Sequence, residues 1–285
     1  MYHSIFGGDR PNWGPWAYSV EQSVFCSHIN RLAKEVSIVP FSAVVDWVRG
    51  EETIPDGAVA LTFDDGYANF TTEALPILER YDVPATVFVS TALVDESAAP
   101  FEHRLAAALK SASSVELDIG GTTFKEVITS ESETIKMYDQ IRSATRFASS
   151  ETREQVLMSL NAPAVESNRV LSSQELRTIA DHSLVTVGSH GHKHIPYIAL
   201  SAEEQRGNAI ESLTFLNDTL GRTPDHFSFP YGSYNQSSIN RIKGIGFQSA
   251  VTTAKRRILP RDWNSSFTLP RCEGSAEIIN RIVSG

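Results

Sequence analysis

The sequence has few cysteines and no long apolar run, and each absence excludes a class of protein. Its two cysteines, Cys26 and Cys272, are far apart and lack the spacing of a metal site. We therefore expect neither a disulfide framework nor a thiolate zinc site, and interpret both as buried free thiols. No uninterrupted apolar run approaches the roughly 20 residues that span a bilayer, so no transmembrane segment is expected.

A concentrated block of basic residues is also missing. With 25 Lys and Arg against 34 Asp and Glu, the net charge is −9, which would repel a phosphate backbone. Nucleic acid is therefore not an expected partner. The first residues, MYHSIFGGDRPNW, do not resemble a secretory signal, so we expect a soluble cytoplasmic protein. No pattern in the sequence indicates an oligomeric state.

Short β-rich runs alternate with helical patterns, an order typical of parallel strands with helices packed outside them. The near-continuous apolar character of these runs fits strands that are buried on both faces. The expected strands are GAVALTF (57–63), PATVFVS (84–90), SLVTVGS (183–189), HFSFP (226–230) and FQSAVTT (247–253). The sequence therefore predicts an α/β fold.

Two of the helices between these strands carry a start signal. Ser172 stands three positions before Glu175, and Ser201 three positions before Glu204, which are both capping-box patterns. The second helix has apolar residues at helical spacing and is expected to stop at Gly221.

The stretch from about 95 to 170 interrupts the alternation, because a strand-helix unit needs only about 30 residues. We interpret it as an insertion in one catalytic domain of residues 1–285. The sequence predicts helices at FEHRLAAALKSA (101–112) and SSETREQVLMSL (149–160), and a hairpin at LDIGGTTFKEV (117–127). Long insertions are usually functional or disordered, and the apolar helix patterns favour an ordered lid or wall beside the active site.

Two aspartates stand side by side at the end of the first expected strand. Asp64 and Asp65 follow GAVALTF and precede Gly66, at a carboxyl strand end, where open sheets and α/β barrels place active sites. Taken alone, the pair is also typical of a solvated turn.

A histidine cluster follows another expected strand, in VGSHGHKHIPY. His190 and His194 are four positions apart, so both imidazoles could reach one cation if the segment turns helically, with His192 pointing elsewhere. Together with the carboxylate pair, the cluster favours a metal site over a group of surface histidines.

A third group, FSFPYGSY, also lies at a strand end. Pro230 and Gly232 predict a tight turn around Tyr231, and such a turn can aim a backbone N–H into a cavity.

In this order, the three groups resemble the motifs of the polysaccharide deacetylase family, metal-dependent carbohydrate esterases that share the NodB homology domain. TFDDG matches the first motif, SHGHKH the His-x-x-x-His second motif and FPYG the third. MYHS and FTLPR (267–271) resemble the subgroup that deacetylates surface polysaccharides and exopolysaccharides. The resemblance covers about residues 1–95 and 170–272, and it implies a distorted (β/α) barrel with the metal at the carboxyl ends of its strands.

The resemblance also assigns roles to the motif residues. It implies that Asp64 is the general base and that Asp65 binds a divalent metal ion. His190 and His194 would complete the ligand set, and such mixed ligands suit zinc, with Co²⁺ or Ni²⁺ as alternatives. Three protein ligands leave positions open for water and the amide oxygen. The Tyr231 N–H would help to hold the oxyanion.

The sequence departs from the family pattern in two places. Ser228 stands where the third motif often carries the arginine that orients the base, and we expect Arg271 to replace it at Asp64. The later Leu-x-His motif, which supplies a general acid in many members, is absent. His3 is the candidate acid, because barrel strand ends converge on one mouth and an imidazole pKa near 6.5 suits donation to an amine. The alternatives are His103, His182, His192 and His226.

Together these features predict a hydrolase that removes an N-acetyl group from an amino sugar of a surface polysaccharide or its precursor. Hydrolysis of another C–N amide on the same barrel is an alternative. Another is a member without catalysis that only binds glycan through aromatic residues such as Trp13, Trp16 and Tyr67. The acetylated sugar could be in a polymer, on a lipid carrier or on a nucleotide, and a cytoplasmic precursor is the preferred substrate.

Overall fold

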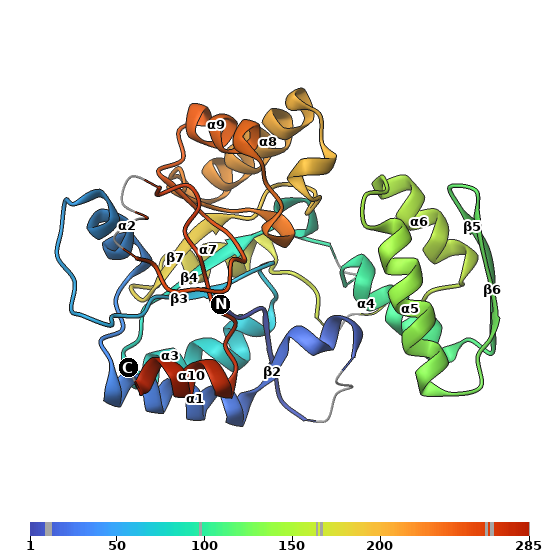
Figure 1. Cartoon of the computed structure of the whole chain (residues 1–285), viewed down its shortest axis with the longest axis horizontal. Helices are drawn as coiled ribbons and strands as arrows, with labels where there is room; N and C mark the ends of the chain where they lie inside the picture. Colours follow the sequence, from blue (N-terminus) through green and yellow to red (C-terminus); the bar gives the residue numbers. More distant parts are fainter. Residues whose placement is uncertain are drawn as a thin grey trace.

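The computed structural model describes residues 1–8, 13–96, 99–163, 165, 168–259, 262 and 265–284. At its centre lies a five-stranded parallel sheet in the order β3-β4-β7-β8-β9 (Figure 1). The strands are β3 (Leu61–Phe63), β4 (Ala85–Val89), β7 (Val185–Ser189), β8 (His226–Ser228) and β9 (Ser249–Val251). Each lies inside one of the five expected runs, so the predicted α/β fold is confirmed.

Two further segments extend the edges of the curved sheet. Tyr2 forms a parallel bridge with Phe63 at the β3 edge, and Leu269 forms one with Val251 at the β9 edge. The two segments meet, because the Gly274 N–H donates to a backbone carbonyl at the first residue at 2.8 Å. The strands therefore curl into the distorted (β/α) barrel that the family resemblance implied.

Helices cover the outside of the barrel (Figure 1). They are α1 (Gln22–Glu35), α2 (Phe41–Arg49), α3 (Leu75–Tyr81), α7 (Ser173–Ala180), α8 (Ala202–Leu220), α9 (Gln236–Ile245) and α10 (Ala276–Val283). Both predicted capping boxes, at α7 and α8, are present, and Gly221 ends α8 with φ 67°.

Shorter elements lie around the barrel. The strands β1 (Ser4–Phe6) and β2 (Ser19–Glu21) pair in parallel. Single turns of 3-10 helix are found at Gly14–Tyr18, Thr91–Leu93, Tyr197–Ala199 and Pro230–Gly232, and a π-helical turn, Phe70–Ala74, leads into α3.

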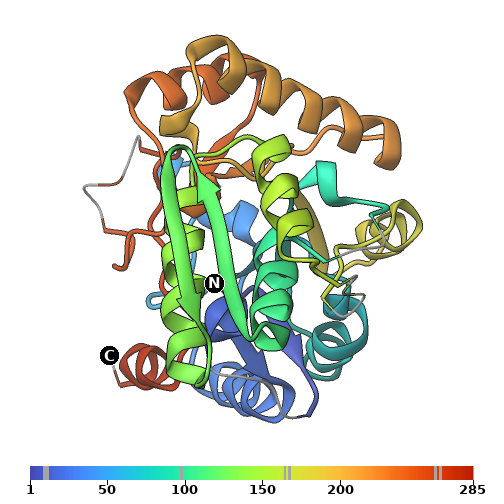
Figure 2. The same ribbon diagram turned by 90° about the vertical axis from the view of Figure 1, so that its right-hand side faces the viewer.

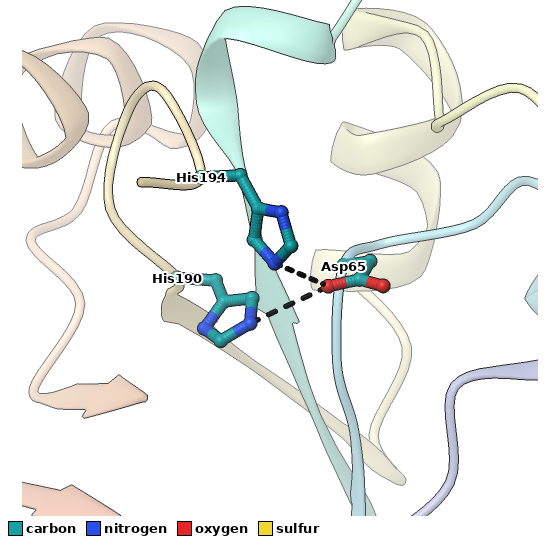
Figure 3. Close-up of side chains that lie close together, drawn as sticks. All are labelled: Asp65, His190 and His194. Carbon is teal, nitrogen blue, oxygen red and sulfur yellow. Dashed lines mark ion pairs between the residues drawn. The ribbon is translucent and has the colours of Figure 1, made fainter. Parts of the chain in front are cut away.

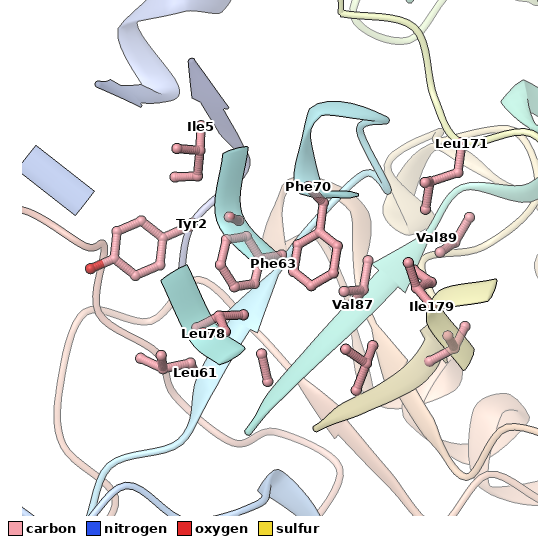
Figure 4. Packing of buried hydrophobic residues seen from close by; sticks show 14 of the residues in the cluster. Tyr2, Ile5, Leu61, Phe63, Phe70, Leu78, Val87, Val89, Leu171 and Ile179 are labelled. Carbon is pink, nitrogen blue, oxygen red and sulfur yellow. The ribbon is translucent and has the colours of Figure 1, made fainter. Parts of the chain in front are cut away.

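The largest cluster of buried apolar residues joins β3, β4 and β7 to α1, α3 and α7. The ring of Phe63 packs edge-on against Phe70 and stacks on Tyr2, with centroids 4.9 Å and 5.5 Å apart (Figure 4). All residues of β3 and β4 are buried, which is why their sequences read as continuous apolar runs. This packing fixes the end of β3, from which Asp64 and Asp65 project.

Residues 101–159, the inserted unit, form a separate group of elements beside the barrel (Figures 1 and 2). They comprise α4 (Phe101–Ser111), β5 (Ser114–Ile119), β6 (Thr122–Val127), α5 (Glu131–Thr145) and α6 (Ser150–Ser159). These elements surround their own apolar cluster, to which Trp13 adds its ring. The two predicted helices and the hairpin are confirmed, while a single domain of residues 1–285 with an insertion at about 95–170 stays a prediction.

The inserted unit leaves and rejoins the barrel at one place. The Ala99 N–H donates to Val165 O at 2.7 Å, and the Ala68 N–H donates to Arg169 O at 2.9 Å. The Leu171 N–H donates to the carbonyl oxygen of Gly66, in the turn that follows β3. Both ends of the inserted unit are thus tied beside the aspartate pair.

Helix α5 was not predicted from the sequence. Its buried residues are Thr134, Met137, Tyr138, Ile141 and Thr145, so threonines interrupt the apolar periodicity on which such a prediction depends. The helix nevertheless has a regular start, because the Ser130 side chain accepts a hydrogen bond from the Glu133 N–H.

Two expectations from composition can also be compared with the structure. Cys26 and Cys272 are free thiols, but both are half-buried rather than buried. The expectation of burial is wrong because Cys26 lies at the margin of the main apolar cluster and Cys272 lies in the segment that closes the barrel. Among the described residues, no helix is long and apolar enough to cross a membrane.

Candidate active site

The two aspartates after β3 face different partners because the chain turns sharply between them. Asp65 has φ 72°, in the left-handed region, and Gly66 follows with φ 78°. A Cβ on Gly66 would lie 3.0 Å from a methyl carbon of Val89, so the close approach to β4 also requires glycine. A non-glycine residue held in this region is a form of backbone strain that clusters at functional sites.

His190 and His194 approach Asp65 from the loop after β7 (Figure 3). Their Nε2 atoms lie 3.4 Å and 3.2 Å from Asp65 Oδ1. The two imidazoles were expected to reach one cation if this segment turned helically, but the loop forms no helical turn. Instead Gly191 and His194 adopt left-handed conformations, with φ 73° and 50°, and fold the segment back toward β3.

The atoms that face one another in this group fit a cation. His190 Nδ1 donates to the Ser228 carbonyl oxygen at 2.7 Å, which orients the ring with Nε2 toward Asp65. Asp65 Oδ1 is buried and accepts no hydrogen bond from the described residues. Ligand atoms of Asp65, His190 and His194 all lie within 4.8 Å of one another. A metal ion would satisfy the carboxylate oxygen and both imidazoles at once.

The charges in this group support the same interpretation. Burial raises the pKa of Asp65, but the imidazoles of His194 and His190 outweigh it and hold that pKa well below its usual range. Burial lowers the pKa of His194, whereas Asp65 raises it, and the net shift is upward. The carboxylate is therefore ionised at neutral pH, the state that binds a cation.

The remaining histidine of the cluster points away, as expected. His192 Nδ1 bonds with the Thr91 hydroxyl at 2.9 Å, and its Nε2 lies 3.6 Å from a Glu211 oxygen. The His192 N–H donates to Asn208 Oδ1 at 2.9 Å, which anchors the loop on α8. His192 thus holds the loop and does not belong to the Asp65 group.

Asp64 is held by Arg271 in a bidentate pair. Arg271 Nη1 donates to Asp64 Oδ1 at 2.7 Å, and Nη2 donates to Oδ2 at 2.6 Å. The side chains are only 6% and 2% exposed, respectively. Burial raises the pKa of Asp64, but the charge of Arg271 outweighs it and lowers the pKa to about 2. Asp64 is thus ionised, and its carboxylate plane is fixed.

The small side chain of Ser228 forms hydrogen bonds with both members of this pair. Arg271 Nη2 also donates to Ser228 Oγ at 2.9 Å, and the Ser228 hydroxyl donates to Asp64 Oδ2 at 3.4 Å. Arg271 reaches the site from the segment that closes the barrel, where its N–H donates to Ala254 O at 3.1 Å. The arginine that meets Asp64 therefore comes from this segment and not from the third motif.

A cavity of about 380 Å³ opens onto these groups. Its barrel side includes His3, Asp64, Asp65, His190, His194 and Tyr231, and its side on the inserted unit includes Glu102, Tyr138, Arg142 and Arg146. The inserted unit is thus one wall of the pocket. A larger cavity of about 420 Å³, between α2 and α10, contains none of the three candidate metal ligands.

Tyr231 connects the barrel to that wall. It lies in the predicted tight turn, Pro230–Gly232, with φ 58°. Its ring centroid is 4.7 Å from that of His194, and its hydroxyl donates to Glu102 Oε1 at 3.0 Å. The turn was predicted from the sequence, but the contact with Glu102 was not.

His3 lines the same pocket, half-buried, with its ring 5.6 Å from that of Tyr18. Burial lowers the pKa of His3, and the charges of Asp65 and Asp64 only partly oppose that shift. The other candidate acids have partners elsewhere: His103 bonds with Tyr67, His182 with Glu79, His192 with Thr91 and His226 with Ser249. None of these four is among the described residues that line the pocket.

Of the three aromatic residues considered for glycan binding, one lines the pocket and two pack against the inserted unit. Tyr67 lines the pocket. Trp13 instead packs in the inserted unit, where its Nε1 donates to Glu131 at 3.0 Å, and Trp16 lies edge-on to His103.

The fold and the site together define the class: an α/β barrel with a carboxylate and two imidazoles at the carboxyl ends of its strands. The sequence profile of the polysaccharide deacetylase family matches residues 51–250, more than half of the chain. The protein therefore belongs to the polysaccharide deacetylase family.

Similar proteins are found among curated sequences and solved structures. A poly-beta-1,6-N-acetyl-D-glucosamine N-deacetylase of Escherichia coli is 25% identical over 211 residues, which are 72% of this chain but 26% of that protein. The chain thus spans about a quarter of the length of this relative. IcaB from Ammonifex degensii aligns with a TM-score of 0.66 at 16% identity, covering 99% of this chain and 93% of that one.

The Streptococcus pyogenes deacetylase PplD, solved in complex with acetate, aligns with a TM-score of 0.62 at 17% identity. This alignment covers 95% of the present chain and 89% of PplD. At such identities the two solved structures establish the shared barrel fold.

Proposed function

We propose that the protein is a metal-dependent hydrolase that removes an N-acetyl group from an amino sugar of a surface polysaccharide or its precursor. The observation that carries this proposal is that a buried Asp65 oxygen, which accepts no hydrogen bond from the described residues, faces the Nε2 atoms of His190 and His194. This group lies beside Asp64, which is paired with Arg271. Family membership and the named deacetylase from Escherichia coli support it.

We assign Asp65, His190 and His194 as the ligands of one divalent ion. Zinc suits a set of one carboxylate and two imidazoles, with Co²⁺ or Ni²⁺ as alternatives. When bound, the ion would polarise the amide and lower the pKa of a water molecule. The hydrogen bond from His190 to the Ser228 carbonyl selects the tautomer that can bind it.

Asp64 is the proposed proton acceptor for the attacking water. Arg271 and Ser228 hold its carboxylate in one orientation, so the group that accepts the proton is already positioned. The backbone N–H of Tyr231, in its left-handed turn, is proposed to hold the developing oxyanion.

His3 is the proposed donor to the departing amine. Because burial lowers its pKa, the imidazole is neutral before the reaction. It would therefore receive a proton within the pocket, ultimately from Asp64, before it gives one to the nitrogen. The test compares His3→Ala on the amide with an activated aryl acetate, whose leaving group needs no proton. Loss on the amide alone identifies the acid, whereas equal loss on both substrates excludes His3.

The preferred substrate is a cytoplasmic precursor of a surface polysaccharide, and the decisive experiment is a substrate panel. Purified protein is incubated with polymeric, lipid-linked and nucleotide-linked N-acetylated sugars, and acetate is measured before chelation, after chelation and after zinc is restored. We expect zinc-dependent acetate release from at least one form. A protein that binds zinc but hydrolyses only other amides would be a different amidohydrolase, and one without any turnover would be a glycan-binding member.

A further inference from the structure

The pocket wall on the inserted unit carries two arginines at helical spacing. Tyr138 and Arg142 lie in α5 and Arg146 caps its end, and their four-residue spacing places them on the same side of the helix. All three line the pocket that holds the candidate metal ligands. In Figures 1 and 2 the hairpin of β5 and β6 is outermost, and α5 lies on its barrel side.

Neither arginine is paired with a carboxylate in the part of the chain that the structure describes. Over the described residues, neither Arg142 nor Arg146 forms an ion pair within 4.0 Å. Like charges four positions apart on a helix repel each other. Arg142 is also half-buried, which adds a desolvation cost.

Other charged groups of the same pocket are already engaged. Asp64 is paired with Arg271, and Glu273 lies 3.1 Å from Lys255. Glu102, the carboxylate on the same wall as the two arginines, accepts a hydrogen bond from the Tyr231 hydroxyl. Among the lysines and arginines that line this pocket, Arg142 and Arg146 are therefore the two without an ion pair in the described residues, in a chain whose net charge is −9.

Arg146 packs over the ring of Tyr231, which lies beside the candidate metal ligand His194. Its guanidinium carbon lies 5.6 Å from the centroid of the Tyr231 ring, and that ring lies 4.7 Å from the ring of His194. Arg153 donates to the carbonyls of Thr145 and Arg146 at 3.2 Å and 3.0 Å, which anchors the end of α5. The arginine pair is thus held beside the reacting centre.

We propose that Arg142 and Arg146 form an anion subsite, which binds an oxyanion group on the glycan next to the sugar that loses its acetyl group. This inference rests on the proposed function and specifies its substrate class as an acidic rather than a neutral glycan. A guanidinium matches the geometry of both a carboxylate and a phosphate. The anion could therefore be the carboxylate of a uronic acid or a sugar phosphate.

The test compares kcat/KM for N-acetylglucosamine oligosaccharides of equal length that are neutral, that contain uronic acid, or that carry phosphate. Wild-type protein should favour one of the acidic substrates. R142Q/R146Q should lower the ratio of acidic to neutral kcat/KM by about 10-fold to 100-fold, mainly through KM, because Gln can offer only a neutral hydrogen bond in place of a charge-assisted one at each position. R142K/R146K should keep part of the ratio, since the charge remains.

A matched control removes two cations of the inserted unit outside the pocket. Lys125 and Lys136 are exposed and paired with Glu116 and Glu126, so K125Q/K136Q has the same net charge as the arginine variant. The selectivity of this control should stay at the wild-type value. Thermal melting of all variants shows whether any of them fails to fold.

The outcomes separate this inference from the proposed function. If no substrate releases acetate, the proposed function fails, and binding of the acidic oligosaccharides by calorimetry still tests the subsite. Binding that weakens with salt and in R142Q/R146Q supports it. If acetate is released equally from neutral and acidic substrates, and the arginine variant keeps that ratio, the subsite is refuted and the deacetylase remains.

Discussion

The mouth of the barrel and the inserted unit contribute to one pocket in opposite ways. At the mouth, Asp64, Asp65 and His190 are buried, whereas His194 and Tyr231 are half-buried. Asp64 pairs with Arg271 and Asp65 with His194, and Asp65, His194 and Tyr231 all have left-handed backbones. On the inserted unit, Arg142 is half-buried and Arg146 exposed, on a helix that packs on its own core. Under the proposed function, the reacting groups lie on a strained sheet edge, and the proposed substrate contacts lie on a separately packed segment.

If this division holds, removing a metal ligand at the mouth should have the largest effect. His194→Ala should lose the ion and reduce acetate release to background, because a buried carboxylate and one imidazole remain. His192→Ala is the matched control, since His192 lies two positions away and bonds Thr91 instead. Metal content per chain and acetate release are measured together. Full metal occupancy and activity in His194→Ala would refute the ligand assignment.

Asp64→Asn should come next, since it removes the base and keeps its shape. We expect the metal content to be unchanged and turnover to fall at least about 100-fold, the typical contribution of a positioned proton acceptor. Wild-type turnover in this variant would mean that Asp64 serves only the turn.

Arg271→Ala should reduce stability as well as activity. It leaves the Asp64 charge buried without a partner, which typically costs about 3–5 kcal/mol. The folded pKa of Asp64, about 2, lies below its ordinary value of 3.8, so the stability that the pair provides is present above about pH 4 and is lost toward pH 2.

The difference in unfolding free energy between wild type and Arg271→Ala should therefore shrink as the pH falls through that window. Denaturant titrations in the presence of chelator measure it without interference from the metal. Arg271→Lys serves as the control that keeps the charge but not the bidentate geometry. A difference that does not change between pH 6 and pH 2.5 would show that the pair does not act through the charge of Asp64.

Changes to the inserted unit should affect substrate use and not metal binding. We expect replacement of residues 101–159 by a short linker, with Trp13→Ser and Trp16→Ser on the exposed face, to keep the ion. The value of kcat/KM on the natural substrate should fall by at least about 10-fold, because remote contacts are lost. Unchanged kinetics would assign the inserted unit to folding or assembly.

The smallest effect is expected where the two regions touch. Tyr231→Phe removes the hydroxyl that donates to Glu102 but keeps the backbone N–H and the ring beside His194. Loss of one such hydrogen bond should lower kcat/KM by no more than about 10-fold and leave the metal content unchanged. Glu102→Gln, which can still accept the bond, should have less effect, and a greater loss than in Tyr231→Phe would show a separate role for the Glu102 charge.

The mouth of the barrel and the inserted unit also differ in how much of each could be predicted from the sequence. Asp64, Asp65, His190 and His194 each follow a buried parallel strand, and such strand ends meet at one edge of a sheet. Their proximity could therefore be inferred without a structure. The left-handed turns that aim them could not, because an Asp or His adopts such a backbone only when the surrounding packing requires it.

The wall of the pocket was less accessible to sequence reasoning. Helix α5 lacks a clean apolar stripe, so neither its existence nor the face it turns to the barrel could be derived. Glu102, Arg142 and Arg146 look like ordinary solvated charges in the sequence, and only tertiary packing brings them to the pocket. The signal that was available was the four-residue spacing of the two arginines.

The hydrogen bond between Ala99 and Val165 has a consequence for how such a chain can change over time. Because the inserted unit begins and ends at neighbouring points, an exchange of that stretch requires little rearrangement of the barrel and costs little loop-closure entropy. The Trp13 ring, which packs into the inserted unit, and the contacts of Tyr67 with His103 and of Tyr231 with Glu102 would have to be adapted to the replacement. If the proposed function is correct, recombination at this one joint could change which glycans are accepted while the metal ligands and Asp64 at the carboxyl ends of the barrel strands stay the same.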